Sequence, residues 1–348
     1  MRRTRAFVSQ VRKTEGAFKA GATVRFRNGR SARLPVGNAD LPKLLETARE
    51  QELALYVRVD DDRQIIAASI PWISLVNSVR PARGGVRVFL DGVSAPVTLR
   101  KSERYERLLR SLKSAMKRRH TVAVAQLRDS GLVDDVLRVP APKWRGSTQT
   151  RSLMIPAPVL TTISAARARN AFAYVDRQRC PIQYWRSPRA RLCIPFSYPE
   201  SGCNARAHRM CRLLAANKRI RAGKAWIFAR QPMAIPTKYA PDLQVEWEDH
   251  VACLVNVDGV LTVLDPSLFK KPVPLAEWAA AVDPRGMLVT TDDRVYSLLR
   301  PNPNGLWSVG FDDLGTRMRW DLLYCAFKVT ERKRHFKNAG PPFRTAQD

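Results

Sequence analysis

The first 140 residues alternate between short stretches with the two-residue period of strands and longer stretches with helical spacing. This pattern predicts helices at residues 41–51 and 105–116 and strands at 23–27, 31–34, 54–59, 64–70, 86–90, 93–99 and 121–124. Asn28-Gly29 and Asp91-Gly92 are dipeptides typical of hairpin turns. We therefore expect a small α+β domain over residues 1–139, and we find no set of catalytic side chains in it.

An aperiodic stretch rich in Pro, Gly and Ser follows this domain. Such composition predicts a linker, which we place at residues 140–158. The periodic pattern then resumes and predicts a second domain over residues 159–330. Residues 331–348 are polar and basic, contain Gly340-Pro341-Pro342, and are predicted to form a disordered tail.

The chain is strongly basic, with 60 Lys and Arg against 31 Asp and Glu and a net charge of +29. The densest cluster, Lys113–Arg119, ends a predicted helix, where cations interact favourably with the helix dipole. Zinc-finger spacing, an RNP motif and a GXXG loop are absent from the sequence. We expect nonspecific attraction to nucleic acid or anionic surfaces. A non-catalytic basic binding protein remains one alternative.

The sequence contains no apolar run of about 18 residues, so we expect no membrane-spanning helix. The start, Met1–Val8, is basic and lacks the apolar region of a secretory signal. We therefore expect synthesis as a soluble cytoplasmic protein, with any export through a signal-independent secretion system.

The six cysteines are too few for a scaffold held together by disulfides. The sequence contains no CxxC pair and only four scattered histidines, so we expect no structural zinc site. The pattern leaves open whether Cys180 pairs with Cys193.

Cys203 is the first candidate for chemistry. Helix-breaking residues end at Gly202, and helical spacing begins at Cys203 and continues to about Lys218. A thiol in the first helical turn lies near unpaired N–H groups, which favour the thiolate and could hold a developing oxyanion. Cys211, deeper in the same helix, is expected to be a buried structural cysteine.

A nucleophilic cysteine needs a base and a group that orients the base. Residues 246–257 and 260–265 alternate as two strands around the turn dipeptide Asp258-Gly259. If the turn has two residues, the residue before it pairs with the residue after it. His250 and Asp265 then lie on one face as diagonal neighbours, with roughly 7–8 Å between their Cα atoms. This distance allows a hydrogen bond between imidazole and carboxylate.

Three segments of the second domain resemble the bacterial protein-glutaminases, also called protein-glutamine deamidases. The first is Gly202–Met210 (GCNARAHRM), and the second is Trp247–Ala252 (WEDHVA). The third is Asp265–Phe269 (DPSLF), followed by Pro272-Val273 and Trp278. Their order and spacing match the family, and the resemblance covers about residues 190–280.

The resemblance implies a transglutaminase-like or papain-like core and no cofactor or metal. It also implies that Cys203 is the nucleophile, His250 the general base and acid, and Asp265 the residue that orients His250. In that family the cysteine attacks a glutamine side-chain amide, ammonia leaves, and water hydrolyses the thioester to glutamate. The partner is therefore a protein or peptide with an exposed glutamine. A cysteine peptidase or a transglutaminase-like acyltransferase on the same triad remains an alternative.

Several neighbouring residues are candidates for contact with substrate. Ser201 and Asn204 flank the candidate nucleophile, and Trp247 lies in the second motif, although its size also suits the core. His208 lies about 140° further round the helix than Cys203 and is not expected to be the base. The N-terminal domain occupies the place of the family's pro-segment. We expect it either to inhibit the site or to recruit acidic partners.

Overall fold

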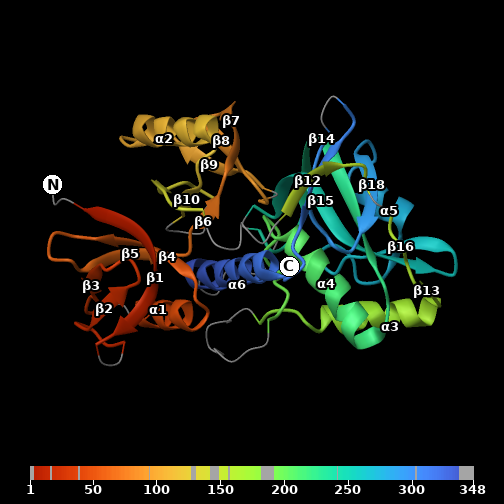
Figure 1. Cartoon of the computed structure of the whole chain (residues 1–348), viewed down its shortest axis with the longest axis horizontal. Helices are drawn as coiled ribbons and strands as arrows, with labels where there is room; N and C mark the ends of the chain where they lie inside the picture. The colour runs from red at the N-terminus through yellow and green to blue at the C-terminus, as the bar shows by residue number, and fades with distance from the viewer. Residues whose placement is uncertain are drawn as a thin grey trace. The chain divides into compact units, whose positions relative to one another are not determined.

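The chain is a mixed α+β protein (Figure 1) whose strands pair almost entirely antiparallel, which confirms the α+β part of the predicted fold class. The computed structural model describes residues 4–15, 18–37, 40–93, 95–126, 131–141, 149–155, 157–181, 192–240, 242–301 and 304–336. The described residues form two units. Unit 1 comprises those within Met1–Asp91 and Pro96–Ala141, and unit 2 comprises Gly92, Val93, Ala95 and those from residue 149 onward.

Unit 1 contains three antiparallel sheets and two helices. The sheet orders are β3-β2-β1-β4-β5, β11-β10-β6 and β7-β8-β9. The strands are β1 (Arg5–Thr14), β2 (Thr23–Phe26), β3 (Ser31–Arg33), β4 (Ala54–Val59), β5 (Ile65–Ser69), β6 (Trp72–Ser74), β7 (Val76–Ala82), β8 (Gly85–Leu90), β9 (Val97–Arg100), β10 (Val122–Ala125) and β11 (Asp135–Arg138). The helices are α1 (Asp40–Glu50) and α2 (Tyr105–Arg118).

The predicted two-residue hairpin at Asp91-Gly92 is wrong. β8 and β9 do pair, but Val88 is opposite Val97, so the connection is much longer than two residues. The backbone N–H of Ala95 donates instead to the carbonyl of Glu200, at 2.9 Å. Ala95 therefore packs in unit 2, although the chain up to Asp91 and again from Pro96 belongs to unit 1.

Unit 2 is built on a sheet of order β17-β16-β15-β14-β18, which β13 joins by parallel pairing with β15. A second sheet has the order β12-β20-β19. The strands are β12 (Gln149–Leu153), β13 (Thr162–Ile163), β14 (Gly223–Pro236), β15 (Gln244–Val257), β16 (Val260–Leu264), β17 (Val273–Pro274), β18 (Met287–Asp292), β19 (Val295–Leu299) and β20 (Trp307–Phe311). The helices are α3 (Ala165–Asp176), α4 (Cys203–Lys218), α5 (Leu275–Val282) and α6 (Thr316–Phe336).

Two predicted irregular segments contain regular structure. β12 lies inside the predicted linker and pairs with β20, because its backbone completes a sheet although its side chains do not alternate in polarity. α6 continues to Phe336, six residues into the predicted disordered tail. Val329 and Thr330 are buried at the end of the second domain, and Glu331 and Arg332 stay buried beyond it, which explains why the helix persists. Residues 142–148 and 156 of the predicted linker and residues 337–348 of the predicted tail lie outside the described residues.

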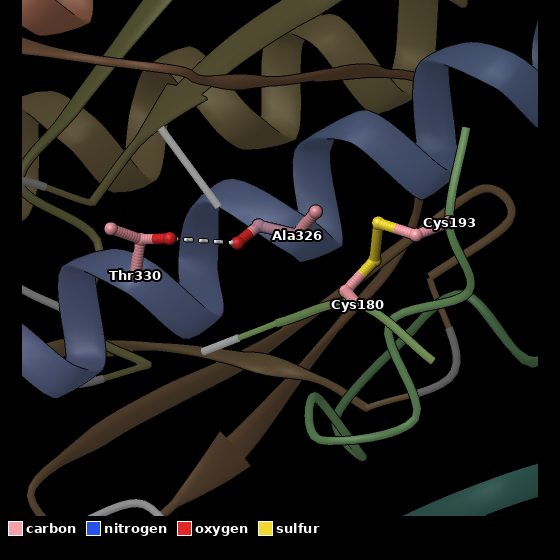
Figure 2. The surroundings of a disulfide bond; sticks show 4 residues. All are labelled: Cys180, Cys193, Ala326 and Thr330. Carbon is pink, nitrogen blue, oxygen red and sulfur yellow. Dashed lines mark hydrogen bonds between the residues drawn. A yellow bond between two sulfur atoms is a disulfide. The ribbon is translucent and has the colours of Figure 1, made fainter. Parts of the chain in front are cut away.

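A disulfide joins Cys180 and Cys193, with Cα atoms 4.9 Å apart (Figure 2). The backbone beside it is also paired, since the N–H of Cys180 donates to the carbonyl of Ile194 at 2.9 Å. Together these bonds tie the end of α3 to the segment that leads to α4. Figure 2 also shows Thr330 of α6 donating its hydroxyl to the carbonyl of Ala326, at 3.3 Å.

Among the described residues, no helix has both the length and the hydropathy that crossing a membrane requires.

Gly202, the residue before α4, is under two constraints. Its φ is +81°, and a Cβ at this position would lie 2.7 Å from Sγ of Cys325. We expect Gly202→Ala to lower the free energy of unfolding by about 2–4 kcal/mol, from backbone strain plus a forced shift of α6. Gly259→Ala is the matched control, because its φ is +92° but no atom lies within 4 Å of the added Cβ. Urea unfolding of both variants tests this, and an equal loss in both would contradict the steric part.

Candidate active site

Helix α4 begins at Cys203, the residue that the sequence predicts as its start. Gly202 caps the helix in the left-handed conformation, which a residue with a side chain rarely adopts. Cys203 is only 2% exposed, and its thiol donates to Oδ1 of Asn204 at 3.4 Å. The first N–H groups of a helix have no partner within it, so the thiol lies at the positive end of the helix dipole.

The hairpin of β15 and β16 has the predicted register. Val257 pairs with Val260, and the pairing continues to Cys253 opposite Leu264. Asp265 follows directly, on the side of the hairpin that faces His250. The two-residue Asp258-Gly259 turn therefore determines which side chains meet at the far end of the hairpin.

His250 and Asp265 form a direct hydrogen bond, with Nε2 and Oδ2 2.8 Å apart. His250 is 1% exposed and Asp265 is 2% exposed. Because Nε2 is bonded to the carboxylate, Nδ1 is the ring nitrogen left for proton exchange. Nδ1 forms no hydrogen bond with any other described residue. The arrangement thus selects one nitrogen of the imidazole for chemistry.

Charge interactions keep this pair ionised. Burial lowers the pKa of His250, but the charge and hydrogen bond of Asp265 and interaction with the Cys203 thiol raise it to about 9. Burial raises the pKa of Asp265, yet the charge of His250 and hydrogen bonds from His250 and Trp278 bring it below its ordinary value. Protonated His250 therefore stabilises the fold below pH 6.5, and this contribution is lost as pH rises through about 9.

Two tryptophans hold the pair in place. Trp247 stacks on His250 with ring centroids 4.3 Å apart and donates its indole N–H to the carbonyl of Pro199. Trp278 donates its indole N–H to Oδ2 of Asp265 at 3.1 Å. Trp247 is 1% exposed, so the structure places it behind the imidazole rather than on a surface that a substrate could reach.

Arg206 is a site residue that sequence reasoning missed. It lies one turn after Cys203 on α4, is 2% exposed, and donates from Nη1 to the carbonyls of Tyr198 and Ser201. Its charge also lowers the pKa of Asp265. The sequence shows only an arginine three residues after the candidate nucleophile, and its burial, which is rare for arginine without partners, is seen only in the structure.

The other predicted candidates occupy different positions. Asn204 contacts the thiol, as described, and the hydroxyl of Ser201 is buried without a partner among the described residues. His208 lies elsewhere: its Nδ1 is 2.9 Å from Nζ of the buried Lys224. Burial and the Lys224 charge lower the pKa of His208 to about 2, so it stays neutral and is not positioned as a base for Cys203.

No cluster of three or more His, Cys, Asp or Glu that could hold a metal ion occurs within the described part of the chain. The candidate site brings together a thiol, an imidazole and a carboxylate, from α4, β15 and the end of β16. Such an arrangement supports attack on a carbonyl carbon followed by proton transfer to a leaving group.

Comparison with known families supports the resemblance seen in the three motifs. Residues 168–282 match a family model described as Glutaminase. The matched segment runs from α3 to α5 and contains Cys203, His250 and Asp265. No curated protein matches the chain.

The chain is also similar to some solved structures. A crystal structure of pro-protein-glutaminase is 22% identical, with a TM-score of 0.49, and the alignment covers 73% of this chain and 92% of that one. The NMR structure of protein-glutaminase from Chryseobacterium proteolyticum is 26% identical, with a TM-score of 0.38. That alignment covers 47% of this chain and 89% of the other.

We expect Asp265→Asn to lower the pKa of His250 from about 9 to below its ordinary value of 6.5, because burial then acts without an opposing charge. The imidazole NMR signals of the wild type and the variant, followed across pH 5–10, measure this shift. Asp258→Asn, which removes a carboxylate at the other end of the same hairpin, is the control and should leave the titration unchanged. A His250 pKa near 6.5 in the wild type would contradict the ion pair.

Proposed function

We propose that this chain, whose residues 168–282 match the glutaminase family model, hydrolyses glutamine side-chain amides in proteins or peptides to glutamate and ammonia. The observation that carries the proposal is the pair formed by His250 and Asp265, which interacts with the Cys203 thiol at the start of α4. We assign unit 2 a transglutaminase-like catalytic core on the same grounds.

In the first half-reaction, Cys203 and His250 react as a thiolate–imidazolium pair, and Sγ of Cys203 attacks the side-chain carbonyl carbon of a glutamine. The oxyanion that forms is held by the free N–H groups of the first turn of α4. The imidazolium of His250 then gives its Nδ1 proton to the amide nitrogen, the carbon–nitrogen bond breaks, and ammonia leaves. A thioester on Cys203 remains, and His250 is neutral.

In the second half-reaction, neutral His250 takes a proton from water through Nδ1, and the hydroxide attacks the thioester carbon. The carbon–sulfur bond breaks, glutamate is released, and the thiolate–imidazolium pair is restored. Asp265 keeps Nε2 protonated throughout, so that Nδ1 exchanges every proton. Ser201, whose buried hydroxyl has no partner among the described residues, is suited to bind the substrate amide.

A peptidase or an acyltransferase would use the same three side chains, since the triad determines thioester formation but not the donor or the acceptor. The family match favours amide hydrolysis of glutamine. The readouts differ: a peptidase would cleave the chain, and an acyltransferase would incorporate an added amine into the substrate.

We also propose that the segment around Ala95 inhibits the site. The three triad residues are at most 2% exposed, so solvent hardly reaches the candidate nucleophile. Ala95 packs in the same apolar cluster as Trp247 and Trp278, and its N–H bonds to Glu200, three residues before the nucleophile. A segment linked to the same chain has a high effective concentration, so weak contacts suffice to inhibit.

The disulfide between Cys180 and Cys193 bears on where the protein acts. Disulfides persist in oxidising compartments and are rare in the reducing cytosol. We therefore propose that the protein acts after export from the cytoplasm in which it is synthesised.

Cys203→Ala and His250→Ala should each reduce turnover of a glutamine-containing peptide by at least about 10³-fold, because nucleophile and base act as one unit. Asp265→Ala should lower it strongly but not additively with His250→Ala. Ammonia release and the accompanying mass increase of about 1 Da in the peptide measure the reaction. Cys211→Ala is the matched control, since Cys211 lies on the same helix and is also buried. A fully active His250→Ala variant would rule out the mechanism.

Ala95→Glu should raise the rate on a short, neutral glutamine peptide, because a carboxylate cannot stay among the tryptophans of the apolar cluster. Val36→Glu, at a residue that is 87% exposed, controls for the added charge. Steady-state ammonia release is the measurement. Two results together would show that the N-terminal domain recruits substrate and does not inhibit the site. Ala95→Glu would have no effect on the rate, and removal of residues 1–145 would lower turnover of an acidic protein, with the largest loss at low salt.

A further inference from the structure

A hollow of about 390 Å³ opens in unit 1 between helix α2 and the strands β10 and β11. Arg107, Arg110 and Arg118 line it from α2, and Arg138 lines it from β11. None of the described residues that line it carries a carboxylate. We call this feature the arginine groove.

The spacing along α2 places these side chains on one face of the helix. Positions 107, 110, 114 and 118 recur every three or four residues, so they form a row about 16 Å long. The hydroxyl of Ser114 lies within this row. A ligand in the groove therefore meets several hydrogen-bond donors in succession.

One of the four guanidiniums is held in place by a buried carboxylate. Asp135, which is 4% exposed, pairs with Arg107 at 3.4 Å and with Arg104 at 2.8 Å, and it accepts a hydrogen bond from the hydroxyl of Tyr56. These contacts fix one end of the groove before any ligand binds. Asp135 carries a single negative charge and faces two arginines, so it does not neutralise the other arginines of the groove.

The remaining cations keep the groove positive. Within the described part of the chain, Arg110, Arg118 and Arg138 form no ion pair. His120 lines the same groove, and burial together with the charges of Arg138 and Arg118 lowers its pKa below the ordinary value. An anion in the groove would offset the part of this shift that the two arginine charges cause, so the pKa of His120 reports on occupancy.

The composition of the groove narrows the class of ligand. Single-stranded nucleic acid binds where aromatic rings stack on bases, and apart from the imidazole of His120 the described lining has no aromatic ring. A peptide also presents backbone N–H groups, and guanidiniums cannot accept hydrogen bonds from them. A phosphate brings up to two charges and three acceptor oxygens, and guanidiniums bind it with paired hydrogen bonds. The volume is that of a small-molecule site.

We propose that the arginine groove binds a compact small molecule carrying two or more phosphate groups, which bridges α2 to β11 through Arg110, Arg118 and Arg138. This binding is independent of the proposed deamidation, because all the groups that recognise the ligand belong to unit 1.

Titration calorimetry of the full chain with tripolyphosphate tests the proposal. Arg110→Gln/Arg118→Gln should weaken binding at least about tenfold, because two paired contacts to phosphate are lost. Lys113→Gln/Lys117→Gln removes the same charge from exposed positions of the same helix outside the groove, and it should change affinity by less than about twofold. Tripolyphosphate should also raise the pKa of His120, followed by its imidazole NMR signal.

Each contrary outcome overturns the proposal. Equal weakening by the two double variants would mean diffuse attraction to a basic surface. Tighter binding of hexaglutamate or of a short oligothymidylate, lost in Arg110→Gln/Arg118→Gln, would assign the groove to a peptide or a nucleic acid. No saturable binding and no shift at His120 would mean that the groove does not bind polyphosphate. Thermal unfolding of both variants confirms that each is folded.

Discussion

The ion pair between His250 and Asp265 is the interaction on which the candidate site depends. Both groups are buried, so each charge is tolerated only because the other is present. The pair keeps the imidazole protonated at neutral pH and leaves Nδ1 for proton transfer. Removing His250 would leave the buried carboxylate of Asp265 without its charge partner, and removing Asp265 would favour the neutral form of the buried imidazole, so the same contact serves the chemistry and the packing.

The surrounding structure holds the nucleophile in position relative to that pair. Arg206 binds the loop before Cys203 through two carbonyls, and the disulfide anchors the start of the same segment to α3. Gly202 then turns the chain into α4 in a conformation that leaves no space for a side chain beside Cys325. Three independent constraints thus converge on the few residues that carry the thiol.

Local patterns were enough to predict the main parts of the site. Helix start signals placed Cys203 at the first position of α4, and the Asp258-Gly259 turn predicted the register that brings His250 to Asp265. Features that depend on distant packing were not predictable. The pairing of β12 with β20 and the departure of Ala95 from its hairpin both depend on residues far away in sequence. Nothing in a local pattern encodes such contacts.

The central claim is that Cys203 forms a thioester with the glutamine side chain. The direct measurement is a rapid acid quench during turnover of a glutamine peptide, followed by intact-mass analysis and mapping of the modified residue. The account predicts an adduct equal to the peptide minus ammonia, located on Cys203 and absent from Cys203→Ala. Release of ammonia by Cys203→Ala, which cannot form the adduct, would contradict it.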